Sequence, residues 1–270
     1  MERLAKLEAT FRQLGIDISE PGFYDSPGFM AQEQRDPEFL VRYAEFVNLR
    51  RATPEYEAFA RSQTVKAAAF LHERLVKDGR PGACVDISGL LSRFLDRLGV
   101  WNYVVKGGLV LEFSAATGIS PTYFWPIMAP GNPAIAGHTW VCAPPFKVID
   151  ISASAQPYRR SESAYISGYI AEENPTPVPA RSVSVVDLLD SDVRNPFIRD
   201  HGRLPTMDEL GDGAKWIPLL GAFQVSRPNV TMRYIGTAVG ASDVGIDKKK
   251  YPTLSGLSPA DAWNEFCDPK

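Results

Sequence analysis

Cysteine, histidine and long hydrophobic runs are all scarce in this sequence. The 270 residues include 3 cysteines and 3 histidines. The cysteines stand far apart, at positions 84, 142 and 267, which excludes a disulfide framework or a cysteine-rich metal cluster and is typical of a reducing compartment. No apolar run approaches the ~20 residues that cross a bilayer, and the N-terminal residues predict a charged amphipathic helix rather than a signal peptide. We therefore expect a cytoplasmic protein without membrane association.

Strong charge of either sign is also missing. The formal net charge is -3, and the one basic run, Lys248–Lys250, is too short to indicate a nucleic-acid surface. With 44% hydrophobic and 23% charged residues, the composition is that of an ordinary globular protein. We found no phosphate-binding glycine loop, internal repeat or metal-ligand spacing, so we expect no cofactor, no metal and no nucleic-acid partner.

The most informative stretch runs from Arg80 to Gly99. Its apolar residues recur at the spacing of one helical face, and Gly99 marks the expected end of the helix. These residues are Ile87, Leu90, Leu91, Phe94, Leu95 and Leu98. Cys84 would lie in the first turn, where the partial positive charge of the free amides favours a thiolate. Taken alone, Cys84 would also fit a small buried core residue.

A second stretch, 136–152, predicts a β-hairpin. Its strands would cover about His138 to Cys142 and about Lys147 to Ile151, joined by a Pro-Pro turn. Because side chains alternate along a strand, His138 lies on the same face as Trp140, and Asp150 on the same face as Val148. Pairing of the two strands would bring His138 and Asp150 close together.

Cys84, His138 and Asp150 are the residue types of a thiol catalytic triad. A cysteine nucleophile needs a base, and an imidazole works best as that base when a carboxylate fixes its orientation. We therefore predict that Cys84 is the nucleophile, His138 the base and Asp150 its orienting acid. The backbone amide of Cys84 is the expected oxyanion donor.

These motifs resemble the transglutaminase-like branch of the papain-like cysteine enzymes. In that superfamily a helix beginning Gly-x-Cys ends in Leu-Gly and is followed by a strand, a His-x-Trp strand and a strand ending in Asp. The matching motifs, in chain order, are Gly82-Ala-Cys84, Leu98-Gly99-Val100, Val104-Val-Lys-Gly107, His138-Thr-Trp140 and Val148-Ile-Asp150. The resemblance implies a papain-like α+β fold, with the cysteine helix packed on an antiparallel sheet. It also implies a peptidase, amidase or transglutaminase that acts on a protein or peptide through a thioester intermediate.

Two other functions stay open. Arylamine N-acetyltransferases are similar in their Cys-His-Asp order and in an Arg-Gly-Gly-x-Cys opening, where this chain has Pro81 for the first glycine. That resemblance implies acetyl transfer from coenzyme A to an amine. The same fold could also serve as a non-catalytic binding module in which the triad is incidental.

The rest of the chain divides into three parts by pattern. We expect a helical part over 1–79, the catalytic helix and sheet over 80–155, and an extension of the same domain or a small subdomain over 156–270. Within these parts we predict a long ordered loop at 114–137, a strand entering a helix over 183–189, and a strand-rich section over 216–239. A terminal helix would begin at Ser258-Pro259.

Four further residues are possible site members by position or type. Asp78 stands where papain-type enzymes have an oxyanion-donating Gln, but an ionised carboxylate cannot donate, and Gln63 lies further upstream. We interpret His72 as a surface or rim residue and Cys142 as a small buried residue. None of the four is assigned a role.

Overall fold

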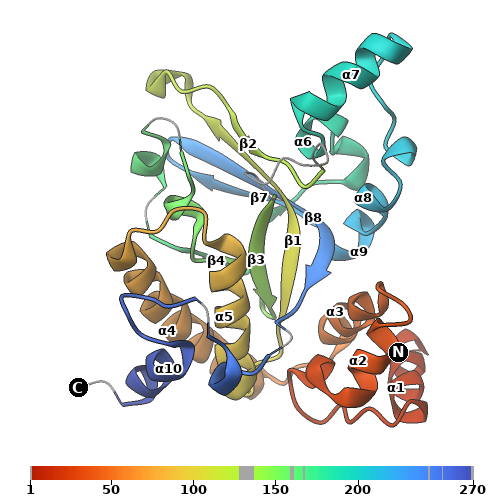
Figure 1. Ribbon diagram of the computed structural model, residues 1–270, viewed down its shortest axis with the longest axis vertical. Coiled ribbons are helices and arrows are strands. Elements are labelled where there is room, and N and C mark those ends of the chain that lie inside the picture. Colours follow the sequence, from red (N-terminus) through yellow and green to blue (C-terminus); the bar gives the residue numbers. More distant parts are fainter. Residues whose placement is uncertain are drawn as a thin grey trace.

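A computed structural model describes residues 2–127, 137–158, 161–166, 168–242, 244–250 and 252–268. It combines helices with one curled antiparallel sheet (Figure 1), which confirms the predicted α+β class at this level. The helices are α1 (Glu2–Gln13), α2 (Pro27–Glu33), α3 (Phe39–Leu49), α4 (Pro54–Asp78), α5 (Cys84–Arg97), α6 (Val185–Leu188), α7 (Ser191–His201), α8 (Asp212–Lys215), α9 (Ile217–Leu220) and α10 (Pro259–Cys267). The strands are β1 (Tyr103–Phe113), β2 (Thr122–Phe124), β3 (His138–Ala143), β4 (Phe146–Asp150), β5 (Ile170–Glu172), β6 (Thr176–Pro177), β7 (Ala222–Arg227) and β8 (Val230–Gly240).

The sheet has the strand order β5-β4-β3-β1-β8-β7-β6, with β2 paired to the outer part of β1. All its strand pairs are antiparallel. β3 and β4 are the predicted hairpin, so this prediction is confirmed. The strands of the last part of the chain, β5 to β8, join the same sheet rather than a separate one.

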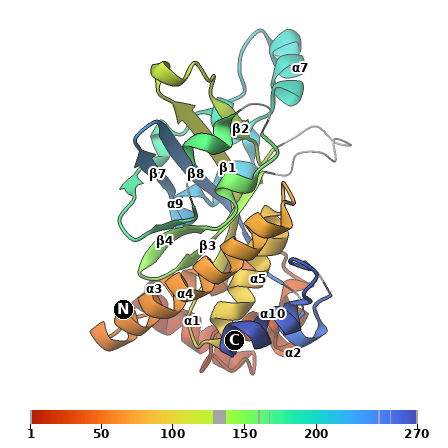
Figure 2. The same cartoon turned by 90° about the vertical axis from the view of Figure 1, so that its left-hand side faces the viewer.

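Helices cover both faces of the sheet. One face packs against α4, α5 and α10, and the other meets the aromatic cluster of α1 to α3. Figure 2 shows the long helix α4 lying alongside α5. In the α1–α3 cluster, the ring of Phe11 lies within 6.1 Å of the rings of Phe23, Phe29, Phe39 and Phe46. Burial of such rings removes large apolar areas from water, at about 25 cal/mol per Å².

Helix α5 begins and ends where its sequence predicts. Ile87, Leu90, Leu91, Phe94 and Leu95 are fully buried and form the face toward the sheet and α4. The left-handed Gly99, with φ of 78°, ends the helix, and Val100 N donates to Leu95 O at 2.8 Å. This packing holds the first residue of α5 against the edge of β3.

Glycine at position 107 lets β8 come close to β1. The pairing of β1 with β8 shifts between Lys106 and Gly107, where the strand bulges. A Cβ on Gly107 would lie 1.9 Å from Ile235 O and 3.0 Å from the Trp140 ring, so no other residue fits without displacing the backbone. Residues Tyr103–Phe113 therefore form one long strand with a bulge between Lys106 and Gly107.

The prediction of a strand entering a helix over 183–189 is confirmed for the helix and wrong for the strand. Residues 183–189 form no strand; they turn into the short helix α6. Ser184 accepts from the start of the helix, and Asp187 reaches back to the Ser184 amide at 2.9 Å, which completes a capping box. This Ser-x-x-Asp cap fixes a helical turn despite the β-branched valines around it.

The predicted 114–137 loop lies in part outside the described residues. Its described portion, 114–127 with Gly137, contains β2 and a short 3-10 turn at Ala115–Thr117. Across the described ranges, no helix is both long and apolar enough to cross a membrane.

Candidate active site

Cys84 is the first residue of α5 and is 5% exposed. The backbone approaches it through Gly82, whose φ of 73° is a left-handed conformation that glycine adopts without strain. Gly82 N donates to Ala155 O at 3.0 Å, which ties this loop to the segment after β4. The helix start and the strand pair are therefore fixed to each other at the point where the thiol lies.

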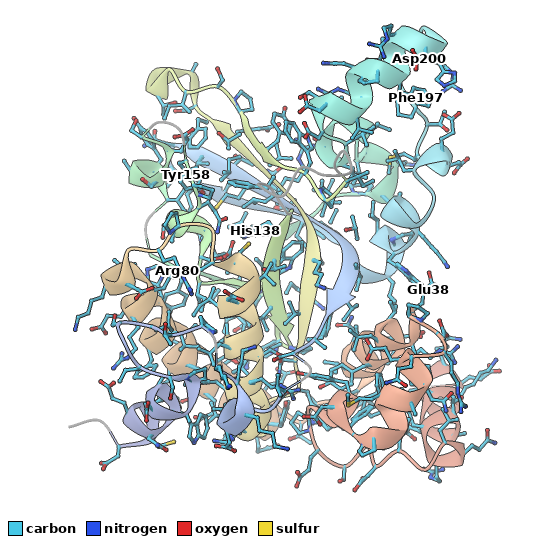
Figure 3. All side chains as sticks on the ribbon, in the orientation of Figure 1. Glu38, Arg80, His138, Tyr158, Phe197 and Asp200 are labelled. Atoms are coloured by element: carbon cyan, nitrogen blue, oxygen red, sulfur yellow. The ribbon has the colours of Figure 1, made fainter. Side chains whose placement is uncertain are left out.

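His138 and Asp150 form a buried hydrogen-bonded pair. His138 Nε2 lies 2.6 Å from Asp150 Oδ2, and both residues are fully buried. They come from the adjacent strands β3 and β4, as the hairpin prediction required. Figure 3 shows His138 near the N-terminal end of α5.

Asp150 accepts four hydrogen bonds in all. Oδ2 accepts from His138 and from the Tyr234 hydroxyl, the latter at 3.0 Å, and Oδ1 accepts from Ser152 N at 2.9 Å and Ser152 Oγ at 3.0 Å. Burial alone would raise the pKa of Asp150, but His138 and the Ser152 donors outweigh it and lower that pKa below its usual value. The carboxylate is thus held in its charged form.

The same pair keeps His138 protonated. Burial acts to lower the pKa of the imidazole, but the charge of Asp150, its hydrogen bond and the nearby Cys84 outweigh burial and raise that pKa to about 10. Because Nε2 is taken by Asp150, Nδ1 is the ring nitrogen left for another partner. Nδ1 makes no hydrogen bond of ordinary length and angle to any residue the structure describes.

Cys84 nevertheless interacts with this imidazole. Burial would raise the pKa of the thiol, yet His138 and then Thr139 more than compensate, and the net pKa of Cys84 is lowered. A lowered thiol pKa and a raised imidazole pKa are the directions that favour a thiolate–imidazolium pair. The three predicted residues are therefore brought into one site, with one short hydrogen bond and one electrostatic contact.

Aromatic rings surround the imidazole on the side of the sheet away from α5. The Trp140 ring lies 6.4 Å from that of His138 and nearly parallel to it, and the rings of Phe124 and Tyr234 lie at 6.0 and 6.3 Å. Tyr158 packs on Phe124 at 5.9 Å and donates its hydroxyl to Ala153 O. These rings exclude water from the His138–Asp150 pair, which strengthens its electrostatic interaction.

Sequence reasoning missed three residues of this site: Ser152, Tyr234 and Thr139. Ser152 follows Asp150 by two positions, and this Asp-x-Ser spacing is a recognisable local turn signal. Tyr234 stands 84 positions after Asp150 in the chain, and only the pairing of β8 with β1 brings it near. No sequence signal would have found Tyr234.

The other candidate residues serve the structure. Asp78 accepts from Ser255 N at 2.9 Å, and Gln63 is partly buried on α4. The partly buried His72 Nδ1 contacts Ile151 O at 2.9 Å, and Cys142 Sγ contacts Phe146 O at 3.5 Å while burial raises the pKa of that thiol. None of these contacts supports a role for the four residues as oxyanion donor, metal ligand or second nucleophile.

Within the part of the chain that the structure describes, no group of three or more His, Cys, Asp or Glu residues could hold a metal ion. All three cysteines are free, with Cys84 and Cys142 buried and Cys267 exposed. Comparison with protein families, with curated proteins and with solved structures found no match.

Proposed function

We propose that this protein is a cysteine-nucleophile enzyme of the papain-like, transglutaminase-like kind, acting on an amide or thioester carbonyl. The observation that carries the proposal is the fully buried His138–Asp150 pair, with Nε2 and Oδ2 at 2.6 Å, beside the Cys84 thiol of lowered pKa. A core cysteine needs no such neighbours. An imidazole and a carboxylate buried together cost desolvation free energy, so their presence at a thiol favours a chemical role.

In the proposed reaction the Cys84 thiolate attacks the carbonyl carbon, and a C–S bond forms as the carbonyl π electrons move to oxygen. When the tetrahedral intermediate collapses, the bond from carbon to the leaving nitrogen or sulfur breaks, and the imidazolium of His138 supplies the proton that the leaving group needs. The neutral imidazole then takes a proton from water or an amine, which attacks the thioester. Collapse of this second intermediate releases the product and restores the Cys84 thiolate and the His138 imidazolium.

The start of α5 supplies the first oxyanion donor. The amide of Cys84 belongs to the first helical turn, whose N–H groups have no acceptor within the helix. Such an amide, aimed where negative charge develops on the carbonyl oxygen, stabilises the tetrahedral intermediate. We propose a protein or peptide substrate, in keeping with the resemblance, and a cytoplasmic location, which suits a thiolate nucleophile and three free cysteines.

Acyl trapping tests this function without knowledge of the natural substrate. The protein is mixed with p-nitrophenyl acetate, quenched in acid and digested, and the acetylated cysteine is located by mass spectrometry. We expect the acetyl group on Cys84, with rapid release of p-nitrophenol that is lost in Cys84→Ser and slowed strongly in His138→Ala. The matched control is Cys267→Ser, which removes the exposed cysteine and leaves the burst unchanged.

In a second set of experiments, the substrate and the acyl acceptor are varied. Adding a glutamine peptide with hydroxylamine tests transglutaminase chemistry, the same peptide in water tests amidase chemistry, and acetyl-coenzyme A with an arylamine tests acetyl transfer. Acetylation of Cys267 or of surface lysines alone, with Cys84 unmodified in the folded protein, would overturn the proposal.

A further inference from the structure

Thr139 carries a buried hydroxyl that has no hydrogen-bond partner. Thr139 follows His138 on β3, so its side chain lies on the opposite face of that strand, the face that α5 covers. The residue is 3% exposed, and Oγ1 makes no hydrogen bond of ordinary geometry to any described residue. Buried hydroxyl groups without a partner are rare because their desolvation is not compensated.

The backbone of Thr139 is attached to the first turns of α5. Ser88 Oγ donates to Thr139 O at 3.1 Å. Ser88 is four residues after Cys84, and residues four apart lie on the same face of a helix. The hydrogen bond from Ser88 therefore holds Thr139 against the helix face on which Cys84 lies.

We propose that the Thr139 hydroxyl donates a hydrogen bond to the Cys84 sulfur when that sulfur is a thiolate. This proposal rests on the proposed function and adds a second thiolate-stabilising group to it. The proton of the thiol moves to His138 Nδ1, while the Thr139 O–H bond stays intact and only reorients toward sulfur. The thiolate is then held by two neighbouring residues of β3 from the two faces of the strand.

The Thr139 contribution is consistent with the electrostatics of the thiol. After His138, Thr139 is the next group that lowers the pKa of Cys84, against burial and the charge of Asp150, which raise it. Other charged groups on the packed elements include the exposed Asp86 in the first turn of α5 and the exposed Lys106 of β1, which is paired in register with Thr139. A hydroxyl does not titrate in the accessible pH range, so its effect can be separated from theirs by substitution.

The test compares four variants by the rate of iodoacetamide alkylation of Cys84 against pH, read by peptide mass spectrometry. Thr139→Val removes the hydroxyl and keeps the β-branched shape that suits a strand, and Thr139→Ser keeps the hydroxyl. His138→Ala reports on the triad. Thr64→Val is the matched control, since Thr64 is also fully buried with an unpartnered Oγ1. Thr64 itself lies about 20 Å along the helix axis from the C-terminal end of α4, since an α-helix rises 1.5 Å per residue.

We expect Thr139→Val to raise the alkylation midpoint by about one pH unit, with Thr139→Ser and Thr64→Val close to the native protein. An unchanged midpoint in Thr139→Val, while His138→Ala raises it, would overturn the Thr139 proposal and leave the triad standing. A raised midpoint in Thr139→Val with no effect of His138→Ala would support Thr139 and overturn the triad. An alkylation midpoint of Cys84 in the native protein equal to that of a free thiol would overturn both the Thr139 proposal and the triad. Circular dichroism confirms that each variant is folded.

Discussion

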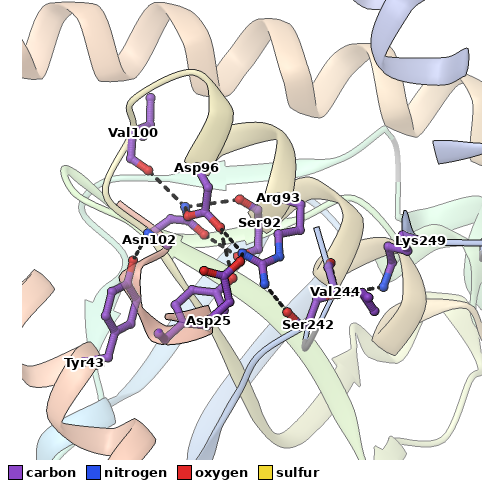
Figure 4. Close-up of polar contacts among 12 residues, drawn as sticks. Asp25, Tyr43, Ser92, Arg93, Asp96, Val100, Asn102, Ser242, Val244 and Lys249 are labelled. Atoms are coloured by element: carbon purple, nitrogen blue, oxygen red, sulfur yellow. Dashed lines mark hydrogen bonds and ion pairs between the residues drawn. The ribbon is translucent and has the colours of Figure 1, made fainter. Parts of the chain in front are cut away.

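Two aspartates buried near opposite ends of α5 behave in opposite ways. Asp150 lies near the N-terminal end, where its pKa is lowered. Asp96 lies in the C-terminal turn, where burial, despite Arg93 and two hydrogen-bond donors, raises its pKa to about 7. Figure 4 shows Asp96 among the polar contacts of Arg93, Asn102 and Asp25. The Asp150 side chain is fully buried and the Asp96 side chain is 9% exposed, so the surrounding donors, and not deeper burial, account for the higher pKa of Asp96.

Asp96 accepts fewer hydrogen bonds than Asp150, and its cationic donor is further away. Its side chain accepts from Tyr24 at 3.0 Å, Asn102 at 2.9 Å and Arg93 at 3.3 Å. Arg93 is shared with Asp25, at 3.0 Å, and with the carbonyl of Ser242. This cluster joins α5 to the α1–α3 region and to the segment after β8, which is a structural role.

The carboxylate of Asp150 accepts more hydrogen bonds than that of Asp96. It accepts from an imidazolium at 2.6 Å and from three further groups on β8 and on the turn after β4. Among the described side-chain atoms that lack a hydrogen-bond partner are His138 Nδ1 and Thr139 Oγ1, and both belong to residues that lower the pKa of Cys84. One network lies beside the Cys84 thiol, and the other connects separate parts of the fold.

The largest effect is expected from Asp150→Asn. The amide keeps the shape of the side chain but removes the charge that holds the imidazole protonated and fixes which ring nitrogen faces Cys84. We expect acetylation of Cys84 by p-nitrophenyl acetate to slow by about 10³- to 10⁴-fold, in stopped-flow or quench measurements. A loss below about tenfold in a folded variant would remove Asp150 from the site and end the contrast with Asp96.

The second prediction concerns stability against pH in Cys84→Ser. In the native protein, the raised His138 pKa and the lowered Cys84 pKa change the proton count in opposite directions, so their effects on the pH dependence of stability oppose each other. Without the thiol, only the raised pKa of His138 contributes to this pH dependence. Its stabilisation is fully present below the unfolded pKa of about 6.5 and is lost as pH rises toward the folded value.

Urea unfolding across this range measures the effect. We expect the unfolding free energy of Cys84→Ser to fall with rising pH by on the order of 2 kcal/mol more than that of the native protein. Cys267→Ser, which removes an exposed thiol, serves as control and follows the native curve. Parallel curves for native protein and Cys84→Ser are the outcome that this account does not allow.

Tyr234→Phe is expected to have a smaller effect. It removes one hydrogen bond to a charged, fully buried carboxylate, which destabilises the protein by about 1 to 2 kcal/mol at neutral pH. Because the lost donor favours the charged form of Asp150, the destabilisation should shrink as pH falls and the carboxyl group is protonated. A difference that is constant across pH would point to lost packing instead.

The smallest change is expected from Asp96→Asn. At neutral pH this carboxyl group is already partly protonated, so we expect less than about 1 kcal/mol loss of stability and unchanged alkylation of Cys84. A raised folded pKa stabilises below the unfolded value of about 3.9, and this stabilisation disappears as pH rises through about 7. Asp96→Asn should therefore flatten the stability curve between those values, and a changed alkylation profile would contradict the separation of the two networks.

The sequence predicted the elements that have strong local signals. The three-and-four spacing from Ile87 to Leu95 predicted α5, and the alternation around His138 and Asp150 predicted the hairpin. In both patterns the apolar residues lie on the side of the element that faces the core, because burial favours apolar side chains there. The Ser258-Pro259 start of α10 is confirmed by a capping box with Asp261.

Long-range contacts could not be predicted in this way. Tyr234 reaches Asp150 only through the pairing of β8 with β1, whose register shifts at the bulge beside Gly107. A shift of one residue moves every following side chain to the other face of the sheet, and no local pattern fixes it. The proposed role of Thr139 could not be predicted either, because it depends on the hydrogen bond from Ser88 to Thr139 O across the helix–sheet interface.

The central claim is that Cys84 and His138 form a thiolate–imidazolium pair in the resting protein. The most direct test is the ultraviolet absorbance of the thiolate against pH, taken as the difference between the native protein and Cys84→Ser and repeated in the His138→Ala background. We predict a thiolate signal well below the free-thiol pKa of about 8.5 that moves up to that value when His138 is removed. A Cys84 signal that appears only near or above about 8.5 in the native protein would contradict the claim.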